Sequence, residues 1–555
     1  MAELATLQLQ LVWDRLLAIV EEQAQTLMRT AFSTVVREAG DLSAGVFNTK
    51  GEMLAQAVTG TPGHVNAMAA SVGKFLDKFP CATLNPGDVL LTNDPWDGTG
   101  HLNDFTIVTP VFLGEQCIGL FASTSHIADV GGRGFGPDAN DVFEEGLRIP
   151  ISYLFRAGEL DATLMMLINA NVRDPITAEG DLYSLTACND QGAKQLLEMM
   201  VDFQLADLVA VSNHILTTSA DAMANEISRL PNGRFENRMR VDGYDSPVDL
   251  VASLEVRDTT IHVDFAGSSP ISPLGINVPL PYTEAYASFG VRCVVGNDIP
   301  NNAGSLRAVT VSAPAGSILN AESPSAVSAR HAIGQMLPDV VLGCLAEILP
   351  DSVPAEGASC IWNPVFRNVP AGATGNAPFV EFVINPIYNG GTGARPGKDG
   401  LSTTAFPSGV RTTSTEVNEA TSPLLIWSKE YLTDSGGVGK RRGGLGQKIE
   451  IAHREGAPFI ISKMFDRISH PPRGRFGGGE GKTGAVYLRD GPQLAAKGRD
   501  VVPAGQTLVL ETPGGGGIGR VAGRERTEVL ADVRAGYVST DAARASYNVD
   551  PDDAD

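Results

Sequence analysis

The start of this chain has the apolar spacing of helices, whereas its later part has short strands between glycine-rich turns. This difference between the two parts restricts the possible folds more than any other sequence pattern. Residues 5–38 place apolar side chains at helical spacing without a glycine or proline, which predicts one long amphipathic helix or two. After about residue 355, glycine runs separate short segments typical of strands, such as QKIEIAHR and QTLVLET. Strands and helices do not alternate regularly, so we predict an α+β fold rather than a parallel α/β array.

The length of 555 residues predicts several domains. We expect an N-terminal α+β domain that carries helices and β-hairpins and closes at the Pro231–Asn232–Gly233 turn. A mixed β-rich domain, a glycine-rich β domain and a helical tail of two short helices follow it. The predicted boundaries are 1–232, 233–400, 401–524 and 525–555.

The composition limits the partners. The net charge of −22 disfavours binding to nucleic acid and to anionic membrane surfaces. No apolar run reaches the roughly 18 residues that a transmembrane helix needs. The N-terminal segment has no basic region typical of a signal peptide, so a cytoplasmic location is expected. The six cysteines stand singly, without a CxxC pair, and we expect free thiols.

One segment carries the residue types of a metal site. In NDPWDGTGHLNDFTIVTP, His101 and Asp104 lie three residues apart on a loop that enters a predicted strand. His126, in FASTSHIADVGG, ends the next predicted strand, and a hairpin of that length brings the two strand ends together. Two imidazoles and a carboxylate suit a divalent metal with open positions for water or substrate. The alternative is a hydrogen-bonded core histidine and a turn aspartate.

Further sequence blocks, together with this segment, resemble the hydantoinase B family. They include SHIADVGG, EEGLRIP, GDL, ARH, GARPGKDG, DSGGVGKRRGGLG and GGGGIG. The resemblance runs in order from about residue 8 to about residue 549. The family includes B subunits of ATP-dependent hydantoinases, 5-oxoprolinase and caprolactamase, and subunits of acetone and acetophenone carboxylases are related to it.

The resemblance implies a metal held by His101, Asp104 and His126. Zinc is the first choice, and manganese or iron would suit the same ligands. Asp41, in REAGDLSAG, stands where a further acidic ligand or active-site carboxylate is expected; the alternative is a turn residue after a helix. His64 would reach the same pocket, or else simply begin a helix.

Two positions depart from the family pattern. Arg520 and Val521 follow the late glycine run where relatives commonly have Asp-Pro. Asn103 stands between two proposed ligands where relatives often have proline, and we expect it to affect substrate preference.

Two glycine-rich segments are similar to nucleotide-binding loops but lack their context. GGGEGKTG at 477–484 has Phe476 where a Walker A loop needs glycine, and a strand, not a helix, is predicted to follow. TPGGGGIG matches GxGxxG only because it contains four consecutive glycines. We therefore expect ATP and its magnesium to bind on another chain.

The implied function is that of the B subunit of a heteromeric cyclic amidohydrolase. A hydantoinase A-type ATPase would phosphorylate the carbonyl oxygen of a hydantoin, 5-oxoproline or lactam, in an assembly such as (αβ)2. This subunit would then direct water onto the activated carbon, with Asp41, Asp94 or Asp97 as general base and the metal lowering the pKa of a bound water. The alternatives are a subunit of an ATP-dependent ketone carboxylase and a non-catalytic scaffold.

Overall fold

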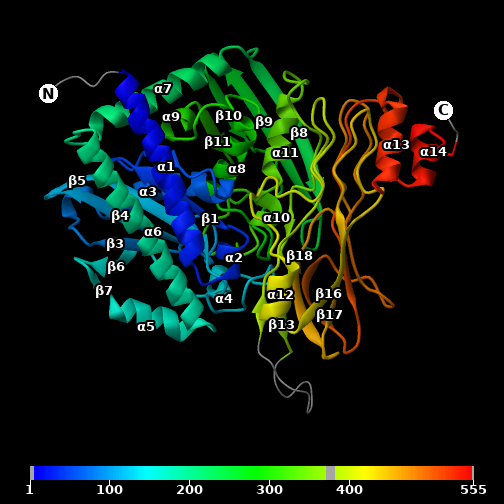
Figure 1. Ribbon diagram of the computed structural model, residues 1–555, viewed down its shortest axis with the longest axis horizontal. Helices are drawn as coiled ribbons and strands as arrows, with labels where there is room; N and C mark the ends of the chain where they lie inside the picture. The colour runs from blue at the N-terminus through cyan, green and yellow to red at the C-terminus, as the bar shows by residue number, and fades with distance from the viewer. Residues whose placement is uncertain (1–5, 370–381, 553–555) are drawn as a thin grey trace. The chain divides into compact units, whose positions relative to one another are not determined.

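The computed structural model describes residues 6–369 and 382–552. The chain forms two compact units (Figure 1). Unit 1 comprises Met1–Phe135, Ala139–Glu236 and Ala252–Arg330, and unit 2 comprises Gly136–Asp138, Asn237–Val251 and His331–Asp555. Helices occur together with several sheets, so the predicted multidomain α+β class is confirmed. The four-part division at residues 232, 400 and 524 stays a prediction, because compactness alone does not define a separately folding domain.

A seven-stranded antiparallel sheet forms the centre of unit 1. Its strand order is β2-β1-β5-β4-β3-β6-β7. The predicted hairpin is its central pair, β4 and β5. The strands are β1 (Leu42–Phe47), β2 (Met53–Gln56), β3 (Val89–Thr92), β4 (Asp104–Leu113), β5 (Gln116–His126), β6 (Ser152–Arg156) and β7 (Glu159–Leu160).

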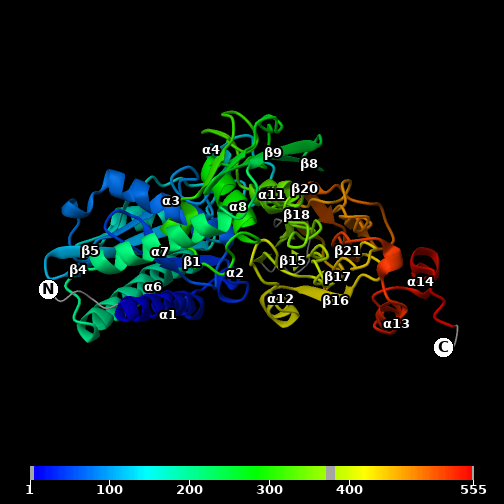
Figure 2. The same ribbon diagram turned by 90° about the horizontal axis from the view of Figure 1, so that it is seen from above.

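Helices cover both faces of this sheet, as Figure 2 shows. Because neighbouring side chains of a strand point to opposite faces, Val46 and Phe121 pack with α1 and α6, whereas Phe47 and Leu120 pack with α3. Every residue of β1 is therefore buried. The long helices are α1 (Thr6–Thr30), α3 (Pro62–Lys78), α6 (Pro175–Asp202) and α7 (Val209–Ile227).

The two-helix alternative for residues 5–38 is confirmed, because α1 stops at Thr30 and a short helix follows. Unit 1 also contains several short elements around the sheet. They are α2 (Thr34–Arg37), the 3-10 helix η1 (Cys81–Thr83), α4 (Val142–Glu145), α5 (Ala162–Asn171), α8 (Leu280–Arg292) and α9 (Ala303–Leu306).

A second sheet has the strand order β11-β10-β9-β8. The chain passes from unit 1 to unit 2 within β8 and returns to unit 1 within β9. The strands are β8 (Gly233–Val241), β9 (Val248–Arg257), β10 (Thr260–Asp264) and β11 (Val309–Ser312), with β10 and β11 parallel.

Unit 2 contains two four-stranded sheets, β14-β13-β18-β20 and β16-β17-β21-β19, and the pair β12-β15. Its strands are β12 (Ile361–Trp362), β13 (Val365–Asn368), β14 (Val383–Ile384), β15 (Tyr388–Asn389), β16 (Leu424–Tyr431), β17 (Gln447–His453), β18 (Phe459–Met464), β19 (Ala485–Leu488), β20 (Lys497–Val502) and β21 (Leu508–Glu511). Its helices are α10 (His331–Gly334), α11 (Leu337–Leu345), α12 (Thr415–Thr421), the 3-10 helix η2 (Val521–Gly523), and the two predicted tail helices α13 (Arg526–Arg534) and α14 (Thr540–Tyr547).

The glycine runs of unit 2 pack backbone against backbone. The carbonyl oxygen of Gly515 accepts from the N–H of Gly437, and its own N–H donates to Gly444. A Cβ atom on Gly515 would lie 1.9 Å from the carbonyl oxygen of Thr392, and one on Gly514 would lie 1.8 Å from that of Ser435. Only glycine fits at such distances. Close packing of the main chain therefore accounts for the run that resembles GxGxxG.

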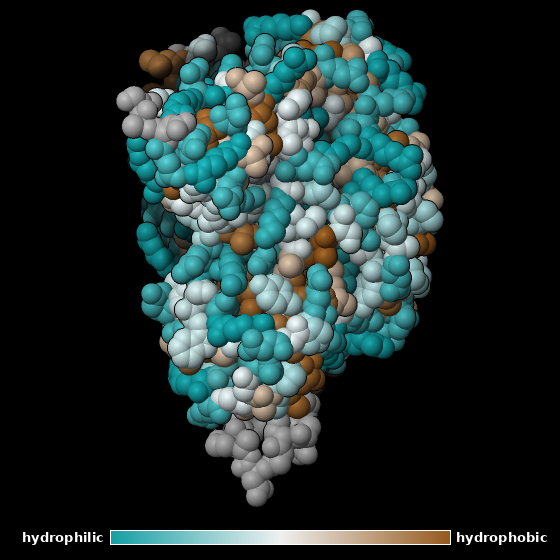
Figure 3. All heavy atoms as spheres, turned by 90° about the vertical axis from the view of Figure 1, so that its right-hand side faces the viewer, coloured by the Kyte–Doolittle hydropathy of each residue, from teal (hydrophilic) through white to brown (hydrophobic). Residues whose placement is uncertain are grey.

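The surface carries the features that the composition predicts. On the face drawn in Figure 3, hydrophilic residues predominate and apolar residues are scattered among them. Among the described helices, none is both long enough and apolar enough to cross a membrane. None of the six cysteines, which all lie in the described part of the chain, forms a disulfide, and three of them are buried.

A buried polar network ties helices α1 and α6 to the central sheet. The side-chain amide of Gln23 donates to Asn189 Oδ1 at 2.8 Å and to the carbonyl oxygen of Ala122 at 3.1 Å. The amide of Asn189 in turn donates to the carbonyl oxygen of Ile107 and to Thr109 Oγ1, both at 3.2 Å. These bonds fix the helices on the sheet that carries the hairpin.

Asn189→Ala should destabilise unit 1, because it removes an acceptor of the buried Gln23 amide and the donor to Ile107 and Thr109. We expect a loss of about 1–3 kcal/mol in the free energy of unfolding, measured by thermal or denaturant unfolding. Asn213→Ala, at an exposed position of α7, is the matched control. Equal unfolding midpoints for the two variants would contradict the assigned role of the network.

Candidate metal centre

The β4–β5 hairpin brings the three predicted ligands together. Asp104 begins β4, His126 ends β5, and the two residues are direct partners in the antiparallel register. His101 lies in the turn just before β4. One potential ligand atom from each of the three lies within 4.8 Å of the others, and all three residues are buried. The spacing of Asp104 and His126 predicted that a hairpin brings their two strand ends together, and the structure confirms this hairpin.

The orientation of the His101 ring favours the binding of a cation beside it. Its Nδ1 lies 3.0 Å from the carbonyl oxygen of Ser328, which can only accept, so Nδ1 carries the hydrogen. Burial, with Arg330 nearby, lowers the pKa of His101 to about 4, and the ring is neutral near pH 7. Its Nε2 lone pair then faces Asp104 Oδ1 at 2.5 Å. Two acceptors this close repel each other unless a cation lies beside both.

Asp104 is ionised, and its two oxygens have different partners. Oδ2 accepts from Arg330 at 2.5 Å, from Thr99 Oγ1 at 2.7 Å and from His64 Nε2 at 2.9 Å. Burial alone would raise the pKa of this carboxyl group, but the positive charges of His64 and Arg330 hold it well below the usual value. Because Oδ2 is fully engaged, Oδ1 is the oxygen available to a metal.

His126 faces the same oxygen. Its Nδ1 lies 3.4 Å from Asp104 Oδ1, and its ring packs edge-on against Phe135 with the ring centroids 4.9 Å apart. The other nitrogen, Nε2, is buried and has no hydrogen-bond partner among the described residues. A core histidine kept for structure would be hydrogen-bonded, so this arrangement favours the ligand interpretation. The donor set of two imidazoles and one carboxylate fits a divalent ion such as zinc.

Asp41 and His64 lie beside this group. Asp41 Oδ1 accepts from Thr61 Oγ1 at 3.1 Å and is 3.5 Å from His64 Nδ1. Burial lowers the pKa of His64, but the carboxylates of Asp104 and Asp41 outweigh burial and the net pKa is raised. The Asp41 side chain is 14% exposed, against 4% or less for the other carboxylate and the three histidines. Asp41 is thus the acidic residue of the centre nearest to solvent.

The other two predicted carboxylates lie outside the group. Asp94 Oδ2 accepts from Arg148 at 2.6 Å, and its Oδ1 accepts from the N–H of Trp96 at 2.9 Å. The Asp97 side chain is 42% exposed and lies 3.6 Å from Lys74 Nζ. Both are engaged in local contacts, and their role as general base stays a prediction.

Arg330 is a buried part of the centre to which the sequence pattern assigned no role, although it stands in the ARH block. Its guanidinium lies 4.0 Å from the ring centroid of Tyr282, and its Nε donates to the carbonyl oxygen of Thr99 at 2.9 Å. Gly100 has a φ of +104°, and a Cβ atom there would lie 2.6 Å from Arg330 Nε. The glycine in DGTGH is therefore required for the arginine to reach Asp104.

Glu145, in the EEGLRIP block, positions His101 indirectly. Its Oε1 accepts from the N–H groups of Val327 at 2.6 Å and Ser328 at 2.7 Å. Ser328 is the residue whose carbonyl oxygen fixes the His101 ring. Burial raises the pKa of Glu145 to about 8, so it is largely protonated near pH 7.

The two asparagines of the segment hold its backbone. The Asn93 amide donates to the carbonyl oxygens of Leu102 and Leu147, each at 2.8 Å. The Asn103 amide donates to the carbonyl oxygen of Ile127 at 2.9 Å. Asn103 thus links the two strand ends, and its effect on substrate preference stays a prediction.

Comparison with known proteins places the chain in a family. The family model described as hydantoinase B/oxoprolinase matches residues 5–521. The chain belongs to the hydantoinase B/oxoprolinase family. An uncharacterized protein of Methanocaldococcus jannaschii is 31% identical, over 96% of this chain and 93% of its own. The resemblance inferred from the sequence blocks is therefore confirmed.

Two solved structures share the fold of this family member. The crystal structure of ATP-dependent caprolactamase from Pseudomonas jessenii matches with a TM-score of 0.89 at 25% identity, over 99% of this chain and 96% of that one. The caprolactamase subunit beta of that organism is 27% identical, over 95% of this chain and 93% of its own. Acetone carboxylase matches with a TM-score of 0.86 at 18% identity, over 98% and 79%, which shows the fold alone.

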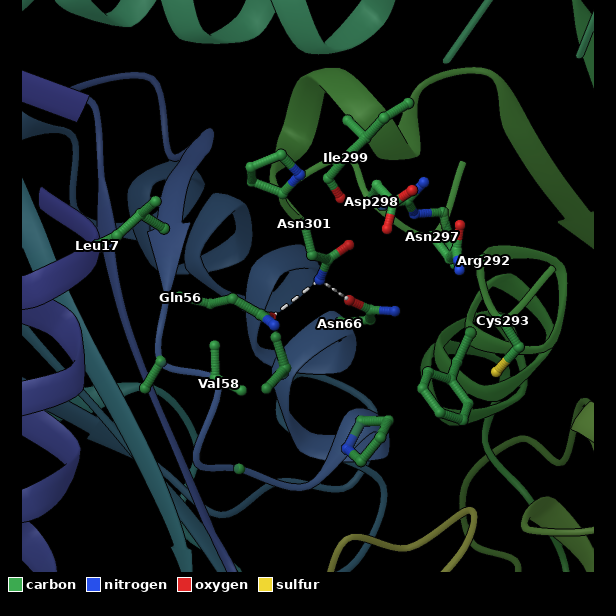
Figure 4. A pocket seen from close by; sticks show the side chains of 16 residues that line it. Leu17, Gln56, Val58, Asn66, Arg292, Cys293, Asn297, Asp298, Ile299 and Asn301 are labelled. Carbon is green, nitrogen blue, oxygen red and sulfur yellow. Dashed lines mark hydrogen bonds between the residues drawn. The ribbon is translucent and has the colours of Figure 1, made fainter. Parts of the chain in front are cut away.

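A cavity of about 540 Å³ in unit 1 lies apart from the centre. Figure 4 shows Asn301 donating to Gln56 and Asn66 across it, each at 2.9 Å. Pro62, Val65 and Asn66 of α3 line it. At 100° per residue, these three share one side of the helix and His64 points to the other. None of the three predicted metal ligands lines this cavity.

Glu145→Gln should change how stability depends on pH. Because the pKa of Glu145 is raised above its unfolded value near 4.5, the folded state keeps a proton that the unfolded chain loses, and stability falls as pH rises from about 4.5 to about 8. The contribution is up to about 1.4 kcal/mol per pH unit in that window. Glutamine keeps the accepting oxygen but does not titrate, so thermal midpoints from pH 5 to 8 should fall less in the variant.

Glu144→Gln is the matched control. Its carboxylate is paired with Arg133, its pKa is lowered, and it titrates below this window. If the pH profiles of the wild-type and Glu145→Gln chains ran parallel, the protonated state assigned to Glu145 would be wrong.

Proposed function

We propose that this chain is the B subunit of a heteromeric ATP-dependent cyclic amidohydrolase that opens the ring of a hydantoin, 5-oxoproline or lactam. The observation that carries the proposal is the buried pair of acceptors, His101 Nε2 and Asp104 Oδ1, which face each other at 2.5 Å with His126 beside them. Membership in the hydantoinase B/oxoprolinase family supports the reaction class.

His101, Asp104 and His126 would hold a divalent cation, with zinc the first choice and manganese or iron suited to the same donors. When bound, the cation supplies Lewis-acid activation of the reacting groups. Ser328 fixes the tautomer of His101, and Arg330 keeps Asp104 ionised, so both side chains are ready to bind the cation.

Asp41 is the carboxylate best placed to act as general base. It is the most exposed acidic group of the centre, and Thr61 orients its Oδ1. His64 lies between Asp41 and Asp104, with one ring nitrogen toward each. Asp41 would take a proton from the attacking water and return it to the leaving nitrogen. The raised pKa of His64 would keep a positive charge beside Asp41.

The nucleotide is proposed to bind on a partner chain, a hydantoinase A-type ATPase in an assembly such as (αβ)2. Lys482 of the Walker-like segment pairs with Glu511 at 3.1 Å, and strand β19 follows it, so the segment lacks the helix N-terminus of a phosphate loop. A relative named caprolactamase subunit beta supports a two-subunit enzyme.

The chemistry balances with that partner. ATP transfers its terminal phosphoryl group to the substrate carbonyl oxygen, and ADP leaves. Water then adds to the same carbon, and the carbon–nitrogen bond breaks to leave an acyl phosphate. A second water cleaves this acyl phosphate into the carboxylate and phosphate. The centre described above would orient the water and handle its protons.

The test is turnover of the assembled enzyme, with ATP, on a panel of cyclic amides. Asp41→Asn should lower kcat about 100-fold or more, the contribution typical of a general base. Asp97→Asn is the comparison variant, because its half-exposed side chain contacts Lys74 and not the centre, and it should retain turnover. The reverse ranking would transfer the role of base to Asp97.

Two outcomes would replace the proposal. Consumption of a ketone only in the presence of bicarbonate would identify a carboxylase subunit. Full turnover by an assembled His101→Ala enzyme would identify a scaffold whose metal-ligand residues take no part in catalysis.

A further inference from the structure

An arginine-lined cavity of about 480 Å³ lies in unit 2 and contains none of the residues of the candidate metal centre. Its volume is in the range of small-molecule sites. Four arginines and two carboxylates contribute to its lining: Arg238, Arg240, Arg467, Arg473, Asp249 and Glu480. These guanidinium groups concentrate positive charge in a chain whose net charge is −22.

The outer part of the cavity is built by strands β8 and β9. Arg238 and Arg240 lie two residues apart on β8, so they project from the same face. Asp249 accepts from Arg238 Nη2 at 2.6 Å and from Arg240 Nε and Nη2 at 2.8 Å each. Each guanidinium has five N–H groups, so both arginines are oriented by Asp249 and keep donors for a ligand.

The inner part contains a buried guanidinium with weak partners. Arg467 is 1% exposed, and its nearest acceptors are the carbonyl oxygens of Gly357 and Pro471 at 3.4 Å and Glu356 Oε2 at 3.5 Å. Its Nε is buried and has no hydrogen-bond partner in the described part of the chain. Asp339 Oδ2 lies 4.0 Å from its Nη2. A buried charge needs close partners, and an anion in the cavity that Arg467 lines would add one.

The loop that carries these groups is held in place in advance. Asp242 accepts from the backbone N–H groups of Ile468, Ser469 and His470 at 2.6 to 3.1 Å, and from His470 Nδ1 at 2.8 Å. Arg467 itself has a φ of +65°, a strained backbone conformation that persists only when its surroundings enforce it. The guanidinium groups therefore converge without rearrangement.

We propose that this cavity is a binding site for a small polyanion, a molecule that carries phosphate or carboxylate groups. Planar guanidinium forks match both groups in geometry and charge. Asp249 accepts three N–H bonds from Arg238 and Arg240, and Glu356 pairs with Arg467 and Arg473, so these two carboxylates orient the arginines. The site would bind either a regulatory ligand or an anionic reaction component.

The test is isothermal titration calorimetry of the full chain with pyrophosphate and, separately, with malonate, at constant ionic strength. We expect saturable binding of at least one of the two to the wild-type chain. The double variant Arg238→Gln/Arg240→Gln should weaken that binding at least tenfold. The pyrophosphate and malonate titrations distinguish a phosphate ligand from a carboxylate ligand.

Arg234→Gln is the matched control, because Arg234 lies on the same strand and face, is exposed, and does not line the cavity. It should bind as the wild type does. Arg473→Gln gives a second variant if the double variant unfolds, which thermal melting would reveal. No saturable binding to the wild type, or an equal loss in Arg234→Gln, would overturn the proposal.

Discussion

The ionised carboxylate of Asp104 is the interaction on which the rest of unit 1 depends. It is completely buried, and a lone buried charge would be strongly unfavourable. Arg330, His64 and Thr99 compensate one oxygen, which leaves the other facing two histidines. A cation at that oxygen would complete the compensation. The centre is therefore a partly neutralised charge, and this is the physical basis on which we propose a divalent cation there.

The fold brings distant segments to this carboxylate. The hairpin supplies Asp104 and His126 as a register pair, and α3 supplies His64. Arg330 is 226 residues away in sequence and reaches the site only because Gly100 has no side chain. His101, Asp104 and His126 are buried at the strand ends. Asp41 is the most exposed acidic group of the centre, which is why we propose it as the base.

Local sequence patterns predicted much of this. Helical periodicity predicted α1 and α2, and short apolar runs between turn residues predicted β4 and β5. The spacing between Asp104 and His126 predicted that a hairpin would join them. The roles of Arg330 and Glu145 were not predicted, because they depend on contacts across more than 180 residues that no local pattern encodes. Asp94 looked equivalent to Asp41 in sequence, and only the structure shows its pairing with Arg148.

The most direct measurement of the central claim is the metal content of the purified full chain, determined by inductively coupled plasma mass spectrometry after growth with zinc, manganese and iron. The account predicts about one equivalent of a divalent ion per wild-type chain and its loss from His126→Ala, because the site is built from residues that must all be present. His262→Ala, on β10 away from the centre, should keep the metal. A wild-type chain without stoichiometric metal, or a His126→Ala chain that retains it, would contradict the account.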